Sequence, residues 1–344
     1  KMQHEITERA PLLDEQGNVR EAGFARKLLP VYSRSAIRAN SLRIKEWDYY
    51  LVCNDHYAVA LTIADLSYMG FDSISFLDFD ERREKTKSEM QFFTMGKKNL
   101  PSTSGEGDVE SGSKKYRIKF SHDGEKRILD FRMENFIDGK PISGKIVLTD
   151  EPEESMVIVT PFKKKRYFYY NQKINCMRAE GKVTAGGKEY IFNPEDSFAV
   201  LDWGRGVWTY KNTWYWGSAS GLVDGVPFGF NIGYGFGDTS AATENMLFCN
   251  GRAHKLSNVY FNIPLNNDGK EEYLKPWTFT SDDGRFEMSF QPILDRAACI
   301  NAFVIKSDQH QVFGRFTGKA VLDDGTEIRV NNLTGFAEKV YNRW

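Results

Sequence analysis

Hydrophobic and polar positions alternate along residues 227–236, where large apolar side chains fall on one face and glycines fall on the other, with Asn231 as the polar side chain of the glycine face. A period of two residues indicates a β-strand. Repeated glycine in a strand indicates a bend or the close approach of another backbone. Residues 214–218 alternate in the same way, and Val223-Asp224-Gly225 between the two segments predicts a hairpin turn, because Asp-Gly readily adopts positive φ.

Short segments with this alternation recur along the chain, separated by turn signals at roughly 8–12-residue spacing, and no segment shows sustained helical periodicity. The pattern predicts a mostly β protein with antiparallel barrels or sandwiches. A length of 344 residues favours two domains, which we place at residues 1–195 and 196–344. Residues 96–115 predict an exposed loop. The charged run at residues 80–89 is typical of a solvated face or short helix, and the tail from Leu333 fits a helix or a strand.

Composition narrows the class of protein. A net charge of −1 argues against a nucleic-acid or membrane-surface binder, since either would be basic. No apolar run is long enough for a membrane span, and residues 1–30 lack the apolar core of a signal peptide. We therefore expect a cytoplasmic protein whose four cysteines are reduced. The cysteines and five histidines form no ligand cluster, and no nucleotide, zinc-protease or nucleophile-elbow motif is present, so we expect neither a metal nor a cofactor.

The sharpest local feature is Asp202-Trp203-Gly204-Arg205-Gly206. A carboxyl group beside a tryptophan inside an aromatic barrel would be partly desolvated, which raises its pKa and allows Asp202 to act as a general acid with Arg205 assisting. The alternative is that Asp202 and Arg205 form a structural ion pair at a barrel mouth.

A second polar group follows the glycine-rich strand. Glu244 is a candidate base or catalytic assistant, and Asn231, Asp238 and Asn245 are candidates for hydrogen bonds to a ligand. The alternative for this group is that it satisfies buried backbone groups in a tight loop. His254 is either a further ligand contact or simply an exposed residue after a turn.

Aromatic and charged residues complete the candidate site. Trp203, Trp214 and Trp216 either line a cavity for an apolar ligand or belong to the core. Arg296 and Glu338 are candidates for buried charge partners of the central stretch.

Nine motifs spread over nearly the whole chain carry a family resemblance. They are residues 13–17, 42–48, 202–206, 213–216, 231–238, 243–245, 251–256, 335–338 and 343–344. Together they resemble the bacterial domain of unknown function 2804 family, which implies no assigned activity.

More remotely, the arrangement resembles the lipocalin-like group that holds carotenoid hydratases of the hydroxyneurosporene synthase type and fungal pericyclase relatives. That resemblance implies two calycin-like β-barrel or sandwich domains that bind large apolar molecules. It also implies a carboxylic acid that protonates a double bond, and Asp202 beside Trp203 is the matching position.

Two functions stay open at this point. One is a binding protein for a lipid- or isoprenoid-like molecule in an aromatic cleft. The other is a cofactor-independent hydratase, isomerase or cyclase in which Asp202 is the acid and Arg205 or Glu244 assists.

Overall fold

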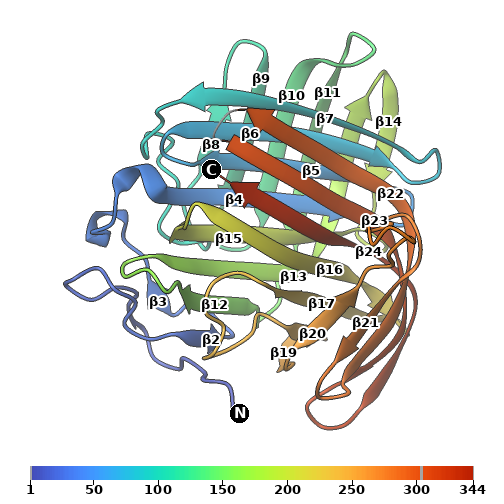
Figure 1. Cartoon of the computed structure of the whole chain (residues 1–344). Coiled ribbons are helices and arrows are strands. Elements are labelled where there is room, and N and C mark those ends of the chain that lie inside the picture. The colour runs from blue at the N-terminus through green and yellow to red at the C-terminus, as the bar shows by residue number, and fades with distance from the viewer. Residues whose placement is uncertain (1, 303–304, 344) are drawn as a thin grey trace.

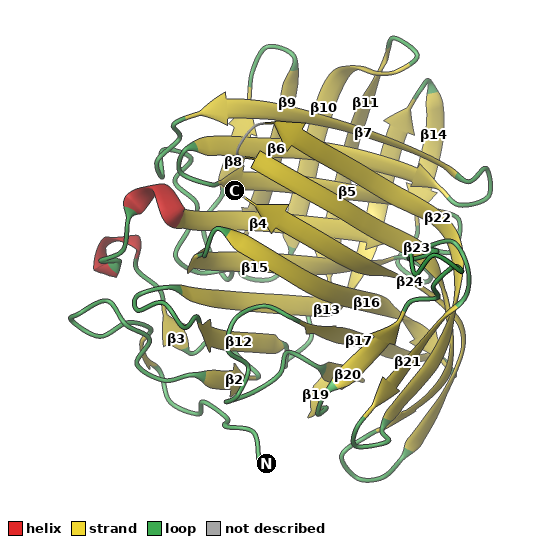
Figure 2. Cartoon of the chain, viewed as in Figure 1, coloured by secondary structure: helices red, strands yellow, loops and turns green. Residues whose placement is uncertain are grey.

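The computed structural model describes residues 2–302 and 305–343. Within them the chain forms an antiparallel sheet of 13 strands, an antiparallel sheet of nine strands and a parallel strand pair (Figure 1). The helices described are two short 3-10 turns, η1 (Arg34–Ala36) and η2 (Ser41–Arg43), drawn red in Figure 2. The predicted mostly β class with two barrel-like antiparallel sheets is confirmed.

The first sheet has the order β7-β6-β5-β4-β15-β13-β11-β10-β9-β8, and β2, β12 and β14 join it through β13 and β12. Its strands are β2 (Gly23–Ala25), β4 (Ile44–Cys53), β5 (Tyr57–Asp65), β6 (Met69–Asp78), β7 (Arg83–Phe92), β8 (Val109–Gly112), β9 (Tyr116–His122), β10 (Arg127–Ile137), β11 (Lys140–Thr149), β12 (Met156–Pro161), β13 (Phe168–Ala185), β14 (Lys188–Phe192) and β15 (Phe198–Val207). The parallel pair is β1 (Ala10–Pro11) and β3 (Pro30–Val31).

The second sheet has the order β19-β18-β17-β16-β24-β23-β22-β21-β20. Its strands are β16 (Lys211–Val223), β17 (Val226–Tyr234), β18 (Met246–Cys249), β19 (Arg252–Lys255), β20 (Val259–Asn262), β21 (Trp277–Ser281), β22 (Phe286–Ala302), β23 (Ile305–Val321) and β24 (Glu327–Arg343). The tail is therefore a strand, and it lies in the middle of the sheet.

The charged run at residues 80–89 is a solvated face, as one of its two expected forms: it falls largely in β7, an edge strand whose residues are all exposed or half-buried. The segment 96–115 differs from the exposed loop that was expected. It is held against the first sheet, because Leu100 and Val109 are buried and the ammonium of Lys98 pairs with the buried carboxylate of Asp72.

The chain changes sheets between β15 and β16, after Val207 and before Lys211. The domain boundary after residue 195 stays a prediction, and it precedes β15. β15 belongs to the first sheet because it pairs with β4 on one side and with β13 on the other.

The predicted hairpin joins β16 to β17. Val223 pairs with Val226, and the two residues between them, Asp224 and Gly225, both have positive φ, at 51° and 77°. Two successive residues with positive φ match the right-handed twist of the strands, which is why Asp-Gly suits this position.

The glycine face of β17 makes the close backbone approach that its sequence predicts. A Cβ atom at Gly229 would lie 2.8 Å from the sulfur of Cys176 and would overlap the carbonyl oxygen of Ala219. Cys176 lies in a bulge of β13 and has a φ of 63°. Glycine at position 229 therefore lets β17 pass directly against β13.

Side chains pack in three layers. One core fills the curve of the first sheet, and a second core fills the curve of the other sheet. Between the sheets lies a layer that we call the seam, in which Tyr49 and Val200 of the first sheet contact Trp216 and Phe336 of the second. The seam fixes how the two sheets sit against each other, and it holds the candidate site.

Candidate functional site

The strand β15 sends the residues of the Asp-Trp-Gly-Arg-Gly motif to opposite faces, as a period of two requires. Asp202 faces the seam, where its carboxylate pairs with Lys173. Trp203 and Arg205 face the first core, where both are completely buried and the guanidinium lies 4.3 Å from the indole centroid.

Arg205 has its own partners in the first core. Its Nη1 donates to Asp48 Oδ1 at 3.0 Å, and its Nε and Nη2 donate to the carbonyl oxygen of Pro101 at 3.2 and 2.8 Å. Trp203 makes edge contacts with Tyr32 and Tyr170. The structure therefore places these two residues away from Asp202, and the ion pair of Asp202 is with Lys173.

Lys173 is the centre of the polar group in the seam. Its Nζ donates to Asp202 Oδ1 at 2.9 Å, to Asn171 Oδ1 at 2.7 Å and to the hydroxyl of Tyr169 at 3.3 Å. It also lies 4.5 Å from the centroid of the Trp216 ring. The side chain is 3% exposed, against 12% for Asp202. All three donors of the ammonium are used, so the pair is held in a fixed geometry.

Glu338 reaches the same region from β24, where it pairs in register with Trp216. One carboxyl oxygen accepts a hydrogen bond from the indole N–H of Trp214 at 3.0 Å. Burial raises the pKa of Glu338 to about 7, which the charge of Asp202 favours and the charge of Arg296 opposes. At neutral pH this carboxyl group can therefore give or take a proton.

Glu244 approaches from the loop between β17 and β18. Burial raises its pKa, the charges of Lys173 and Lys255 oppose the rise, and the charge of Asp202 adds to it. Its backbone carbonyl accepts from Asn231 Nδ2 at 2.9 Å, and Asn231 Oδ1 accepts from the indole N–H of Trp216 at 2.7 Å. Asn231 therefore ties the Glu244 loop to the aromatic wall of the seam.

The other predicted polar residues have different roles. Asn245 accepts a hydrogen bond from the backbone N–H of Gly233 at 2.7 Å, which holds the loop against β17. Asp238 is exposed. His254 accepts from the backbone N–H of Asp323 at 3.1 Å, at a turn of the second sheet.

An aromatic wall borders the polar group. It consists of Trp47, Tyr169, Trp208, Trp214 and Phe236. Trp208 has edge contacts with Trp47, Trp214 and Phe236, at centroid distances of 5.0, 5.8 and 4.7 Å. Such ring faces are well suited to an apolar or cationic group.

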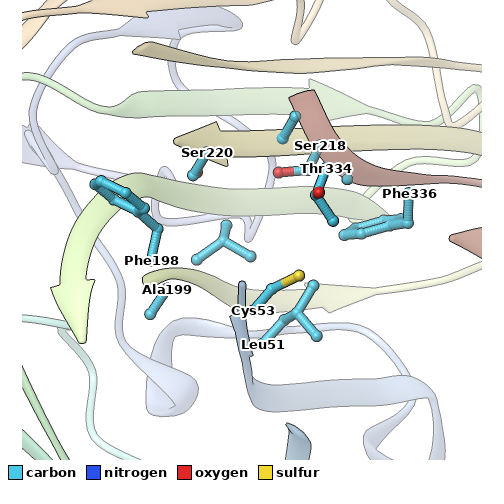
Figure 3. A pocket seen from close by; sticks show the side chains of 11 residues that line it. Leu51, Cys53, Phe198, Ala199, Ser218, Ser220, Thr334 and Phe336 are labelled. Atoms are coloured by element: carbon cyan, nitrogen blue, oxygen red, sulfur yellow. The ribbon is translucent and has the colours of Figure 1, made fainter. Parts of the chain in front are cut away.

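Two hollows open in or beside the seam. The apolar hollow in Figure 3 has a free volume of about 270 Å³ and is lined by Leu51, Cys53, Phe198, Ala199, Val200, Ser218, Ala219, Ser220, Thr334, Gly335 and Phe336. The second, which we call the Glu244 hollow, has about 250 Å³ and is lined by Ile158, Thr160, Tyr169, Gly233, Tyr234, Phe236, Thr239 and Glu244. Both volumes include space open to solvent, so the enclosed part of each hollow is much smaller.

Sequence reasoning missed Lys173 and Tyr169, although a signal was present. Tyr169, Asn171 and Lys173 alternate along the first half of β13, which is buried, and this places three polar groups on one face. Glu338 is in the seam, as is Arg296, whose Nε donates to Gln311 at 2.9 Å.

The described ranges contain no helix long and apolar enough to cross a membrane. In the same part of the chain, no group of three or more histidine, cysteine, aspartate or glutamate side chains is arranged to hold a metal ion.

The pattern of the whole chain decides the family. The family model for DUF2804, a domain of unknown function, matches residues 3–344. The chain belongs to the DUF2804 family. A comparison of this DUF2804 sequence with curated proteins finds no match.

Three solved structures share the fold of this DUF2804 protein over nearly its whole length. Kievitone hydratase from Nectria haematococca has a TM-score of 0.53 and 11% identity, covering 97% of this chain and 98% of its own. A putative AttH from Nitrosomonas europaea has a TM-score of 0.52 and 10% identity, covering 97% of this chain and 99% of its own. CghA, solved with Sch210972, has a TM-score of 0.55 and 10% identity, covering 96% of this chain and 97% of its own. At these identities the likeness shows the fold, which is two lipocalin-like β halves.

Proposed function

We propose that this DUF2804 protein is an acid–base enzyme that acts on a small, largely apolar molecule in the seam between its two sheets. The observation that carries the proposal is the buried ion pair of Asp202 and Lys173 in the seam, whose charges act on two further carboxyl groups of raised pKa, Glu244 and Glu338. These groups come from β13, β15, β24 and a loop, so the fold is what assembles them.

The roles follow from the contacts. Asp202 is the ion-pair partner of Lys173, and an ion pair favours the charged carboxylate. We therefore assign the proton-donating role to Glu338, whose pKa is raised to about 7. In a hydration, the Glu338 carboxyl gives its proton to one carbon of a C=C bond, forming a C–H bond and a carbocation at the other carbon. A water oxygen then bonds to that carbon, and the proton it loses returns to the Glu338 carboxylate. The ring face of Trp214 favours the positive charge.

Isomerisation and cyclisation start from the same protonation. They differ in that the cation loses a proton from a neighbouring carbon, or bonds to a second double bond of the same molecule before that loss. The structural neighbours include kievitone hydratase, and this supports hydration as the first reaction to test.

Binding without chemistry is the second candidate function, and the apolar hollow in Figure 3 favours it. Leu51, Phe198 and Phe336 line this hollow together with small side chains. Its size suits a small molecule or one end of a lipid- or isoprenoid-like chain rather than the whole of one.

The test is to extract the folded protein with solvent, identify the bound molecule by mass spectrometry, and return it to the protein in D₂O. Protonation at carbon adds deuterium, so we expect the mass of the molecule to rise with wild type and to stay unchanged with Glu338→Gln. Glu327→Gln, an exposed change on the same strand, is the matched control and should behave as wild type. A molecule that binds but gains no deuterium would refute the enzyme activity and support the binding function. An empty extract would count against the binding function.

A further inference from the structure

The Glu244 hollow combines apolar walls with one buried carboxyl group. Its walls include the rings of Tyr169, Tyr234 and Phe236, and Glu244 is the acidic residue among the side chains that line it. The other polar side chains of the lining, Thr160 and Thr239, are neutral. A hollow with ring walls and a few polar groups both holds and orients a flat apolar group.

The carboxyl of Glu244 has unused hydrogen-bonding capacity. Its Oε2 is buried and has no hydrogen-bond partner among the described residues. Buried polar atoms in proteins are nearly always paired, so an atom of this kind calls for an explanation. A ligand group that forms a hydrogen bond with Oε2 would supply the missing partner.

The position of this carboxyl group is fixed by its neighbours. Asn231 donates a hydrogen bond to the Glu244 backbone carbonyl. Asn245, the residue after Glu244, accepts a hydrogen bond from the backbone N–H of Gly233. A Cβ atom at Gly233 would overlap Glu244 Oε1, so glycine leaves the room in which the carboxyl group lies. The site is therefore built into the fold rather than formed by a mobile surface side chain.

The surrounding charges select the chemistry of the ligand. An anion would meet the carboxyl groups of Glu244 and Asp202. A cation would meet the ammonium groups of Lys173 and Lys255, whose charges both act on Glu244. A neutral hydroxyl group avoids both repulsions, and it costs less to bury than a charge.

We propose that the Glu244 hollow binds the hydroxyl-bearing end of a neutral, ring-sized apolar group, with the hydroxyl hydrogen-bonded to Glu244 Oε2. This inference rests on the proposed function and narrows its substrate class to neutral alcohols or phenols. An alcohol is also what the hydration of an apolar alkene forms, so the same site would recognise the product of that reaction.

The experiment compares small probes of one shape. Phenol, toluene, benzylammonium and benzoate are titrated against the full chain, and binding is followed by saturation-transfer NMR. We expect phenol to bind about tenfold more tightly than toluene, as one hydrogen bond to a buried carboxyl group allows, and both charged probes to bind more weakly than phenol. Glu244→Leu should abolish the preference for phenol, while the control Glu125→Leu, at an exposed turn, should keep it.

Glu244→Gln covers the case in which Glu244→Leu does not fold, because the amide retains a hydrogen-bonding oxygen and should keep part of the preference. Equal binding of phenol and toluene, a preference for benzylammonium, or no binding of any probe would overturn the inference. The preference for phenol and the deuterium test fail independently. A phenol preference without deuterium incorporation would refute the proposed enzyme activity and keep the hydroxyl site. Deuterium incorporation without a phenol preference would refute the hydroxyl site and keep the enzyme activity.

Discussion

Replacing the buried carboxyl of Glu338 with an amide, in Glu338→Gln, should make the stability of the protein less dependent on pH. The pKa of Glu338 is about 7 in the folded chain, against an ordinary value of 4.5. A raised pKa means that the folded chain holds this proton more tightly than the unfolded chain does. The group therefore stabilises the fold fully below pH 4.5, and that stabilisation is lost as the pH rises through 7.

The size of the effect follows from the difference between the two pKa values. Each pKa unit corresponds to about 1.4 kcal/mol, so the whole effect is about 3 kcal/mol, of which about 2.5 kcal/mol falls between pH 5 and pH 8. No large reduction for solvent screening applies, because Glu338 is 5% exposed. Glutamine has nearly the same shape and does not titrate in this range.

The measurement is urea unfolding at several pH values between 5 and 8, followed by tryptophan fluorescence. Relative to wild type, Glu338→Gln should gain about 2.5 kcal/mol in free energy of unfolding across that range. Glu327→Gln is the matched control, since Glu327 is exposed on the same strand. Stability curves of wild type and Glu338→Gln that stay parallel within about 0.5 kcal/mol would refute the assignment of this titration to Glu338.

Two further changes test the packing of the seam. Asp202→Ala leaves the ammonium of Lys173 buried without its carboxylate and should cost about 3 kcal/mol of unfolding free energy. The double change Asp202→Leu with Lys173→Met should recover most of that loss. Urea unfolding that shows the same loss for both variants would contradict this. Gly204→Ala adds a methyl group that overlaps the ring of Trp47 and should lower the melting temperature by an amount equivalent to about 1–3 kcal/mol. Calorimetry should show little change for the control Gly105→Ala, where the nearest atom is 3.7 Å from the added carbon, and equal melting temperatures would argue against the clash.

Much of the fold was open to prediction from the sequence because a strand period is a local property. The hairpin at Asp224-Gly225 and the close approach at Gly229 both follow from residues that need unusual φ or little space. The point at which the chain changes sheets is not a local property, because β15 joins the first sheet through pairing with β4 and β13. Those strands are distant in sequence, and no local pattern records such a pairing.

The site was predictable only in part, for a related reason. The Asp-Trp-Gly-Arg-Gly motif suggested that Asp202 and Arg205 act together, but residues three apart on a strand face opposite ways. The partner of Asp202 is Lys173, on the neighbouring strand. Pairing in register brings these two residues together, and register depends on the sheet rather than on either segment alone.

The strand order also determines how long some strands wait for a pairing partner during synthesis. β4, β5, β6 and β7 emerge early, but β4 lacks its second neighbour until β15 is made, more than a hundred residues after β7 ends. At about 5–20 residues per second, the ribosome takes on the order of ten seconds to supply it. In the second sheet β16 waits in the same way for β24. Nascent chains of this protein therefore expose open strand edges for seconds, and they should depend on chaperones that bind such edges during translation.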